Sequence, residues 1–230
     1  MKGRLAGSAL LVIGLMTVMA GARQHNRLFP PEDLGLLEGP DRDAWQRPDM
    51  IMDALRISDG SIVADLGAGG GWFTIRLARR VGPNGRVYAE DIQPQMIEAI
   101  ARRVAREGLE DRVETLLGTA NDPKLTVPVD AVLIVETYHE MEQPTVLLGK
   151  VALALKPQGR LGIVEYKSDG GGPGPPMAER VEPERVIRSA EAAGLRLCSR
   201  ETFLRYQYML VFVRADGDPR LQSCGGRAGG

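Results

Sequence analysis

Cysteine and histidine are scarce in this sequence, which has two residues of each type among 230. Two cysteines are too few for a zinc ribbon or for a framework of several disulfides. Cys198 lies in an apolar-alternating segment and is predicted to be a core residue. Cys224 lies in a glycine-rich tail and is predicted to be a loose thiol, with a Cys198–Cys224 disulfide as the alternative.

An excess of charge of either sign is also absent, because 29 basic residues face 30 acidic ones and leave a net charge of −1. Such a balance gives no basic footprint for nucleic acid, so no nucleic-acid partner is indicated. Hydrophobic residues make up 43% of the chain, enough to bury a sizeable core. The length suits one domain with appendages.

The first 22 residues differ from the rest of the chain. Lys2 and Arg4 precede a largely apolar run over 5–20, and small residues at 20 and 22 form a cleavage-site pattern. This order predicts a secretory signal peptide. A membrane anchor is the alternative, although the run is barely long enough to span a bilayer, and membrane contact is expected only if it is retained. Either reading places the globular part outside the cytoplasm, exported as a periplasmic or secreted protein or anchored to a membrane.

The remaining chain alternates short apolar runs with amphipathic segments, which predicts a doubly wound, mostly parallel α/β sheet. The last two of its seven strands are joined by a short link and are predicted to form an antiparallel hairpin. Strands are predicted at 61–66, 86–90, 112–117, 129–135, 160–166, 195–203 and 206–214, and helices at 49–56, 72–81, 94–107, 144–155 and 183–193. Around this domain, which covers 49–214, we predict a linker or lid at 23–48 and a disordered tail at 215–230.

A glycine-rich loop, DLGAGGG over 65–71, joins the first strand to the next helix. A triphosphate loop would need Lys-Ser/Thr after its last glycine, where Trp72 stands, and no Gly-x-Gly-x-x-Gly dinucleotide spacing fits. Asp65, two residues before the first glycine, would repel a pyrophosphate and attract an ammonium group. S-adenosylmethionine carries an ammonium group and no phosphate, so this acid favours it over a nucleotide.

Residues 63–74 (VADLGAGGGWFT) resemble motif I of the class I S-adenosylmethionine-dependent methyltransferases, and the resemblance extends over about 50–214. It implies a Rossmann-like fold ending in a β-hairpin, S-adenosylmethionine as cofactor and methyl transfer as activity. It also implies that five residues of the loop contact the cofactor: Asp65, Gly67, Ala68, Gly69 and Gly71.

Two further segments resemble cofactor motifs of the same family. Residues 87–91 (VYAED) look like its second motif, which implies that Asp91, with Glu90 as the alternative, holds the ribose hydroxyls and that Ile92 packs on the adenine. Residues 118–123 stand where the family often shows Gly-Asp-Ala, but the acid is replaced. The cofactor contacts expected there are Thr119, Ala120 and Asn121.

The candidates for chemistry follow the fourth strand, beside the expected methyl group. His139 can titrate near neutral pH and could deprotonate or orient an acceptor, with a structural hydrogen bond as the alternative. Glu136 is predicted to touch the cofactor or the acceptor, and Tyr138 to line the pocket. One histidine with scattered acids does not make a metal-ligand set, so no metal is expected.

Other residues are expected at the rim of the same site. Trp72 directly follows the glycine loop, Trp45 lies in the lid segment, and Met96 is expected in a helix core. The loop 168–176, rich in glycine and proline, is either a substrate gate or a flexible insert.

The favoured function is therefore S-adenosylmethionine-dependent methyl transfer to a small-molecule acceptor, since the chain has no room for a separate substrate domain. The first alternative is an exported protein that binds the cofactor without turnover, because S-adenosylmethionine is made in the cytosol. A weaker alternative is an NAD-linked oxidoreductase. The acceptor and the oligomeric state do not follow from the sequence.

Overall fold

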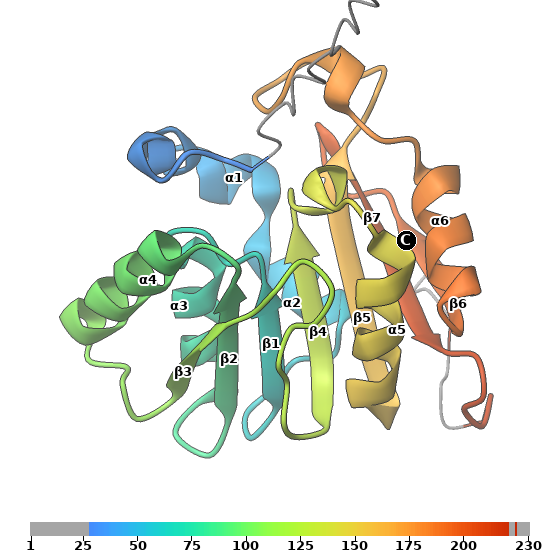
Figure 1. Cartoon of the computed structure of the whole chain (residues 1–230), viewed down its shortest axis with the longest axis horizontal. Coiled ribbons are helices and arrows are strands. Elements are labelled where there is room, and N and C mark those ends of the chain that lie inside the picture. Colours follow the sequence, from blue (N-terminus) through green and yellow to red (C-terminus); the bar gives the residue numbers. More distant parts are fainter. Residues whose placement is uncertain (1–27, 221–223, 225–230) are drawn as a thin grey trace, which may run out of the picture.

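The computed structural model describes residues 28–220 and Cys224, so the predicted signal or anchor segment lies outside the described residues. It shows a single seven-stranded sheet in the order β3-β2-β1-β4-β5-β7-β6 (Figure 1). The strands are β1 (Ile62–Leu66), β2 (Arg86–Asp91), β3 (Val113–Leu117), β4 (Val129–Val135), β5 (Leu155–Tyr166), β6 (Leu195–Glu201) and β7 (Gln207–Arg214).

The strands β1 to β5 run parallel, whereas β7 pairs antiparallel with both β5 and β6. This confirms the predicted doubly wound sheet with its terminal hairpin. The chain first builds outward from β1 through β2 to β3 and then returns to β4 on the other side of β1. Ligands of such sheets bind where the order reverses, at the carboxyl ends of these two central strands.

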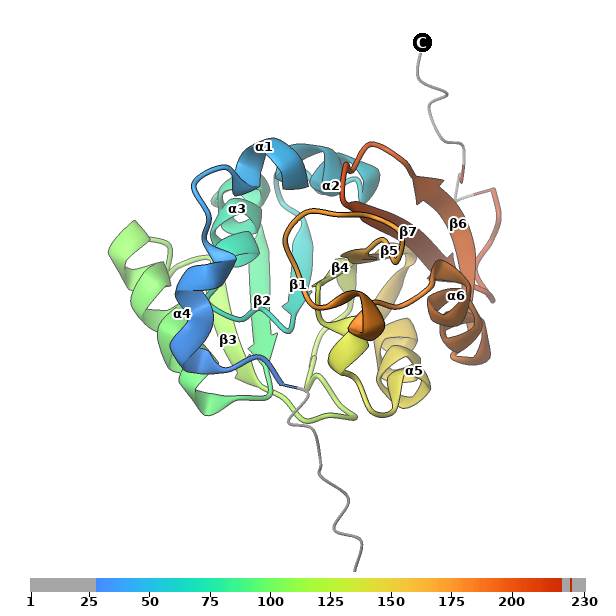
Figure 2. The same cartoon turned by 90° about the horizontal axis from the view of Figure 1, so that it is seen from above.

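Helices cover both faces of the sheet (Figure 2). The helices α2, α3 and α4 pack on one face, and α5 and α6 on the other. The described helices are α1 (Arg42–Gln46), α2 (Pro48–Ala54), α3 (Trp72–Val81), α4 (Pro94–Glu107), α5 (Pro144–Ala154) and α6 (Pro183–Ala192), with short 3-10 turns η1 (Pro31–Leu37), η2 (Tyr138–Glu140) and η3 (Met177–Glu179). Among residues 28–220, none of these helices is long and apolar enough to cross a membrane.

The central strands read as continuous apolar runs because both of their faces are covered. Val63 and Ala64 of β1 and Leu133 and Ile134 of β4 have no exposed surface. Their side chains divide between the two hydrophobic cores, one on each face of the sheet. The rigid centre of the sheet therefore fixes the positions of the loops that follow β1 and β4.

One connection differs from its prediction. Residues 156–159 lie between the predicted helix at 144–155 and the predicted strand at 160–166, but β5 already begins at Leu155, and they form an irregularity inside it. Val129 pairs with Leu155 and Ala131 with Arg160, so the extra residues lie opposite a single residue of β4. The pattern Lys-Pro-Gln-Gly signals a turn equally well whether it lies between two elements or within a strand.

The structure also corrects the prediction of a loose thiol, because Cys198 of β6 forms a disulfide with Cys224. The two cysteines are 26 residues apart in the chain. The disulfide ties this point of the predicted disordered tail to the sheet. The sequence did not reveal the pairing because Cys224 belongs to no regular element that would place it beside β6.

Replacing Cys224 by serine should lower the free energy of unfolding by about 2–4 kcal/mol, since the crosslink restricts the unfolded chain over a loop of this size. Thermal unfolding with and without a reducing agent measures the effect. The reductant should lower the melting temperature of the wild-type protein and leave the C224S variant unchanged. Equal melting of the oxidised and reduced wild-type proteins would contradict the expectation.

Candidate functional site

A cavity of about 990 Å³ opens at the carboxyl ends of β1, β2, β4 and β5. Its floor is the glycine loop after β1, and its roof is formed by the segment around η1 and α1, which lies above this edge of the sheet in Figure 1. Leu34 of η1 lies against Gly70, and Glu38 forms an ion pair with Arg103 of α4 at 2.5 Å. Part of the predicted lid therefore closes over the loop.

Asp65 at the end of β1 is 3% exposed and accepts a hydrogen bond from Oγ1 of Thr74 at 2.7 Å. Burial raises the pKa of its carboxyl to about 6, against the opposing effect of the Thr74 bond, and the charge of Asp91 adds to the rise. A cation in the cavity would stabilise this buried charge.

The glycine loop packs tightly against the loop that follows β4. Gly67 has a φ of 67°, a left-handed conformation that favours glycine, and a Cβ atom there would overlap the side chain of Thr137. The backbone of both loops is thereby held at the cavity wall. Any larger residue at position 67 would force the loops apart.

The amide groups of this loop are directed at two acids at the end of β2. The N–H of Gly69 donates to Oδ2 of Asp91 at 3.0 Å, and the N–H of Gly67 donates to Oε2 of Glu90 at 3.4 Å. Oδ1 of Asp91 accepts a further bond from the N–H of Gln93 at 2.9 Å. Both acids line the cavity, so the loop presents carboxylates where a phosphate-binding loop would present free N–H groups.

Burial and then the neighbouring charge of Asp91 raise the pKa of Glu90 to about 8. Burial also raises the pKa of Asp91, against the opposing effect of its backbone hydrogen bonds. Ionising two adjacent buried acids costs free energy because their charges repel each other, so Glu90, with its pKa of about 8, keeps its proton near neutral pH.

After β4 the backbone turns at Glu136, whose φ is 55°. Its Oε1 accepts hydrogen bonds from the amide groups of Gln46 at 2.8 Å and Gln207 at 2.6 Å, and it lies 3.8 Å from the Arg42 guanidinium. These partners come from α1 and β7, so the carboxylate joins the lid to the far side of the sheet. Glu136 also lines the cavity.

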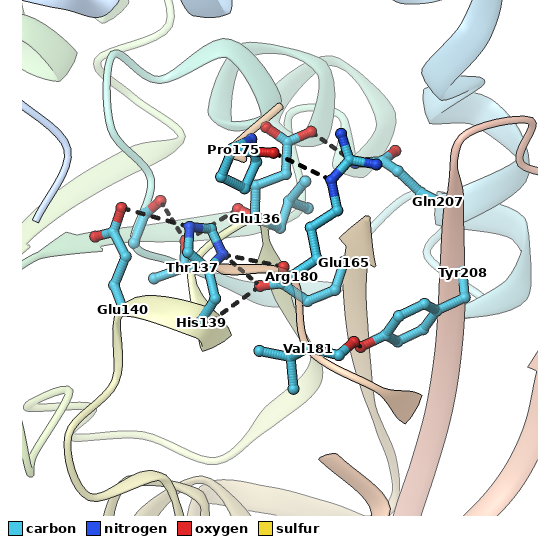
Figure 3. A network of polar contacts seen from close by, with 12 residues as sticks. Glu136, Thr137, His139, Glu140, Glu165, Pro175, Arg180, Val181, Gln207 and Tyr208 are labelled. Atoms are coloured by element: carbon cyan, nitrogen blue, oxygen red, sulfur yellow. Dashed lines mark hydrogen bonds and ion pairs between the residues drawn. The ribbon is translucent and has the colours of Figure 1, made fainter. Parts of the chain in front are cut away.

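His139 forms a dyad with Glu165, a residue of β5 that is 1% exposed (Figure 3). Nδ1 of the imidazole lies 3.0 Å from Oε2 and 3.2 Å from Oε1 of Glu165. A carboxylate can only accept, so Nδ1 carries the proton and Nε2 is left as the basic nitrogen. Burial lowers the pKa of His139, but the bond to Glu165 and the charges of Glu165 and Glu140 outweigh it, so the pKa lies above its ordinary value.

Glu140 lies on the other side of the imidazole, with its Oε1 4.0 Å from Nε2 of His139 (Figure 3). Burial raises the pKa of Glu140 to about 7, against the opposing charge of His139. Both side chains line the cavity. This wall therefore holds two titratable groups whose pKa values are both raised.

Tyr138 does not reach the cavity, which contradicts its predicted role in catalysis. Its ring is 2% exposed in the core formed with α5 and α6, and its hydroxyl donates to Oγ of Ser189 at 2.8 Å. The first residue of η2 points into the sheet, whereas the next one, His139, points into the site. The sequence alone did not give the phase of this short turn.

The glycine- and proline-rich loop after β5 is a built wall of the cavity. Arg180 donates hydrogen bonds to the carbonyls of Lys167 at 3.0 Å, Pro175 at 3.1 Å and Pro173 at 3.2 Å (Figure 3 shows its bond to Pro175). Gly174, with a φ of 106°, packs on the ring of Tyr166, where a Cβ atom would lie 2.6 Å from Cε2. These bonds hold the loop in place and speak against a flexible insert, whereas its role as a substrate gate stays a prediction.

Ten of the predicted site residues line the cavity: Asp65, Gly67, Ala68, Gly69, Asp91, Ile92, Thr119, Ala120, Glu136 and His139. Their contacts with a cofactor stay predictions. Gly71 is instead the N-cap of α3, packed near Ile100, and Asn121 is not part of the lining, although its Oδ1 is buried without a partner among the described residues.

Sequence reasoning missed Glu165, Gln207, Arg42 and Gln46. The one available signal was Glu165 itself, a carboxylate within the otherwise apolar run of the fifth strand, since a buried acid needs a partner. The other three come from elements distant in sequence, and nothing local marks them.

The ligand-free protein should lose stability as pH rises from about 5 to 8. The pKa of Glu90 is about 8 in the folded state and 4.5 in an unperturbed glutamate, so its contribution is fully present below pH 4.5 and is lost as pH rises through about 8. Asp65 and Glu140, whose pKa values are also raised, act in the same direction. Chemical denaturation at several pH values measures this.

The variant E90Q should show a flatter pH profile and exceed the wild-type free energy of unfolding at pH 8 by on the order of 1–3 kcal/mol. E110Q, which replaces an exposed glutamate, is the control and should follow the wild-type curve. A profile for E90Q as steep as that of the wild type would show that Glu90 is ionised in the folded protein.

Comparisons of the sequence and of the structure both match this chain to methyltransferases. A family model described as "Methyltransferase domain" matches residues 63–159. The chain is 34% identical over 113 residues to a catechol O-methyltransferase of Mycobacterium tuberculosis, covering 48% of this chain and 50% of that protein. It is 29% identical over 125 residues to a demethylmenaquinone methyltransferase of Lactobacillus johnsonii, covering 54% and 50%. It thus spans about half the length of these curated relatives.

A solved structure resembles the fold over most of the chain. The S-adenosylmethionine-dependent methyltransferase of Aquifex aeolicus superposes with a TM-score of 0.74 and is 28% identical. The match covers 80% of this chain and 98% of the other one. It therefore extends well beyond the segment that the family model matches.

Proposed function

Because the chain belongs to the class I S-adenosylmethionine-dependent methyltransferases, we propose that it transfers the methyl group of this cofactor to a small-molecule acceptor. The single observation that carries the proposal is the cavity, which has the cofactor motifs on one wall and the His139–Glu165 dyad on another. The first wall suits the cofactor, and the second suits an acceptor that must lose a proton.

The residues of the first wall fit S-adenosylmethionine better than a nucleotide. The loop amides of Gly67 and Gly69 already donate to Glu90 and Asp91, so a pyrophosphate would find carboxylates in place of donors. Asp65 would hold the ammonium group, and Asp91 the ribose hydroxyls. Ile92 and Met96, which also line the cavity, would cover the adenine.

When bound, S-adenosylmethionine supplies a sulfonium-bound methyl group, and the sulfonium is a good leaving group. The protein then has to position the acceptor and, where needed, remove its proton. Nε2 of His139 is the available base, and Glu165 fixes the tautomer and stabilises the imidazolium that forms. Glu136, bonded to two glutamines, stiffens the same wall.

The small size of the proposed acceptor rests on two observations. The cavity lies under the lid and the loop around Arg180, so an acceptor must fit between them. The relatives named above are a catechol O-methyltransferase and a demethylmenaquinone methyltransferase, both named for small organic acceptors.

We further propose that the protein is exported or anchored through its first 22 residues. The signal-like pattern of that segment and the Cys198–Cys224 disulfide support this, because disulfides persist mainly in oxidising compartments. The mass of the mature N-terminus tests it. A chain that begins at Arg23 indicates cleavage, an intact chain in the membrane fraction indicates an anchor, and an intact chain in the cytosol contradicts the proposal.

Titration calorimetry of the full chain with S-adenosylmethionine and with NAD tests the cofactor assignment. We expect saturable binding of one S-adenosylmethionine and no saturable binding of NAD. The opposite result would favour the oxidoreductase alternative. Binding without turnover across an acceptor panel would favour the exported binding protein.

A further inference from the structure

The dyad indicates what kind of acceptor the site serves. A neutral amine or a thioether can attack a methyl group with its lone pair and needs no base. Here a histidine on the cavity wall is backed by a carboxylate that is almost fully buried. That arrangement suits an acceptor that gives up a proton during the attack, such as a hydroxyl group, a thiol, an acidic C–H group or an ammonium group.

The strength of the base selects among hydroxyl groups. The ordinary pKa of an imidazole is about 6.5, and that of a phenol is about 10, so the two pKa values differ by about 3–4. The pKa of an aliphatic hydroxyl group is close to that of water, about 16, and so differs much more from the pKa of an imidazole. Proton transfer to His139 is therefore less costly from a phenol than from an aliphatic alcohol, although a histidine–carboxylate pair can serve an aliphatic hydroxyl as well, so a phenol is the better-matched acceptor.

Aromatic side chains form the wall beside the dyad. Trp45, Tyr166 and Tyr206 line the cavity, with ring centroids 6.4 Å apart for Trp45–Tyr166 and 6.1 Å apart for Trp45–Tyr206. The side chains of Tyr166 and His139 both lie within electrostatic reach of the Glu136 carboxylate. The aromatic wall and the base therefore serve the same part of the cavity.

The loop held by Arg180 completes this wall on its other side. Pro173, Gly174 and Pro175 line the cavity, and Gly174 packs directly on the ring of Tyr166. The space beside the dyad is thus bounded by flat or apolar groups, which suit a planar ring.

The charges of the lining argue against ionised acceptors. A carboxylate would face Glu136 and Glu140, which lie on the same wall as His139, and Arg42, which also lines the cavity, is already engaged by Glu136 at 3.8 Å. An ammonium group at the aromatic wall would meet guanidinium groups, since Arg180 lies 5.2 Å from the ring centre of Tyr166 and Arg205 lies 5.0 Å from that of Tyr206. The aromatic faces that would attract a cation already hold one.

We infer that the acceptor is an uncharged phenol, held against Trp45, Tyr166 and Tyr206, with its hydroxyl group directed at His139. This inference rests on the proposed function. The acceptor oxygen gains the methyl carbon and loses its proton to Nε2 of His139. The electron pair of the broken carbon–sulfur bond stays on sulfur, which becomes a neutral thioether, and the imidazolium returns the proton to solvent.

The test uses binding in place of turnover. The full chain is saturated with S-adenosylhomocysteine, which has no methyl group to transfer, and titrated at pH 6 with three nitro-aromatic probes. These are 4-nitrophenol, its anionic relative 4-hydroxy-3-nitrobenzoate and the cationic 4-nitrobenzylamine. We expect 4-nitrophenol to bind at least tenfold more tightly than either charged probe. Equal or tighter binding of a charged probe would overturn the inference.

Two variants locate the probe. In H139Q the bound phenol should show less of the visible absorbance of its anion than in the wild type at the same pH, because the imidazolium that stabilises this anion is gone. In W45L the affinity for 4-nitrophenol should fall at least fivefold, while the affinity for S-adenosylhomocysteine stays within twofold. An unchanged spectrum in H139Q, or unchanged phenol affinity in W45L, would contradict the proposed placement.

Failure of this inference is distinguishable from failure of the proposed function. If S-adenosylhomocysteine binds and the phenol does not, the cofactor assignment stands and the acceptor class is wrong. If neither S-adenosylmethionine nor S-adenosylhomocysteine binds, the proposed function fails, and the acceptor inference fails with it.

Discussion

The H139Q variant should transfer methyl groups to a phenolic acceptor about 10²–10⁴ times more slowly than the wild-type protein, the usual contribution of a positioned general base. Glutamine keeps a polar side chain of similar length but cannot take the proton at Nε2. Binding of S-adenosylmethionine should stay within twofold, because the dyad lies on the acceptor wall. Release of S-adenosylhomocysteine measures turnover, and calorimetry measures binding.

Glu165 acts through His139, so its variant should change the pH dependence as well as the rate. In the wild type, kcat/KM should rise with pH as the imidazole loses its proton, with a midpoint above the ordinary histidine pKa of about 6.5. In E165Q the midpoint should move to lower pH, because the charge that raises the histidine pKa is removed. The control E179Q, a change in an exposed glutamate of η3, should leave the profile unchanged. If H139Q transfers methyl groups at the wild-type rate, or if the pH midpoint of E165Q equals that of the wild type, the His139–Glu165 contact is structural and not catalytic.

The second large effect is expected at Asp91. The D91N variant should bind S-adenosylmethionine about 10- to 150-fold more weakly, which corresponds to the loss of about 1.5–3 kcal/mol for hydrogen bonds to a charged group. The substitution keeps the size of the side chain at the end of β2 but removes one of the two acceptor oxygens. Calorimetry gives the affinity, and thermal unfolding shows that the variant is folded.

The control for D91N is D111N, a change in an exposed aspartate before β3, which should bind like the wild type. The variant E90Q, at the acid next to Asp91, shows which of the two acids binds the ribose. If D91N binds normally while E90Q binds weakly, then Glu90 holds the ribose hydroxyls, and the assignment of the two acids must be exchanged.

Much of the fold follows from local patterns in the sequence. The apolar runs at β1 and β4 and the amphipathic helices between strands are read directly from neighbouring residues. The terminal hairpin is equally visible. What the pattern did not give was the irregularity at 156–159 inside β5 and the pairing of Cys198 with Cys224. Both features depend on residues that are distant in the sequence and become neighbours only in the folded protein.

The candidate site divides in the same way. The cofactor wall was predictable because Asp65, the glycine loop and Asp91 each lie at or directly after the end of a strand, and parallel strands bring their carboxyl ends together. The acceptor wall was only half predictable. His139 stood out as one of two histidines, but its partner Glu165 is 26 residues away in another strand. Such a pairing depends on the register of β4 and β5.

Transfer of a deuterated methyl group tests the central claim most directly. The full chain is incubated with S-adenosylmethionine labelled as CD₃ and with 4-nitrophenol and other uncharged phenols, and the products are analysed by mass spectrometry. The account predicts an aryl ether that carries the intact CD₃ group, formed together with an equal amount of S-adenosylhomocysteine. Saturable binding of S-adenosylmethionine with no labelled product from any acceptor, phenolic or not, would contradict it.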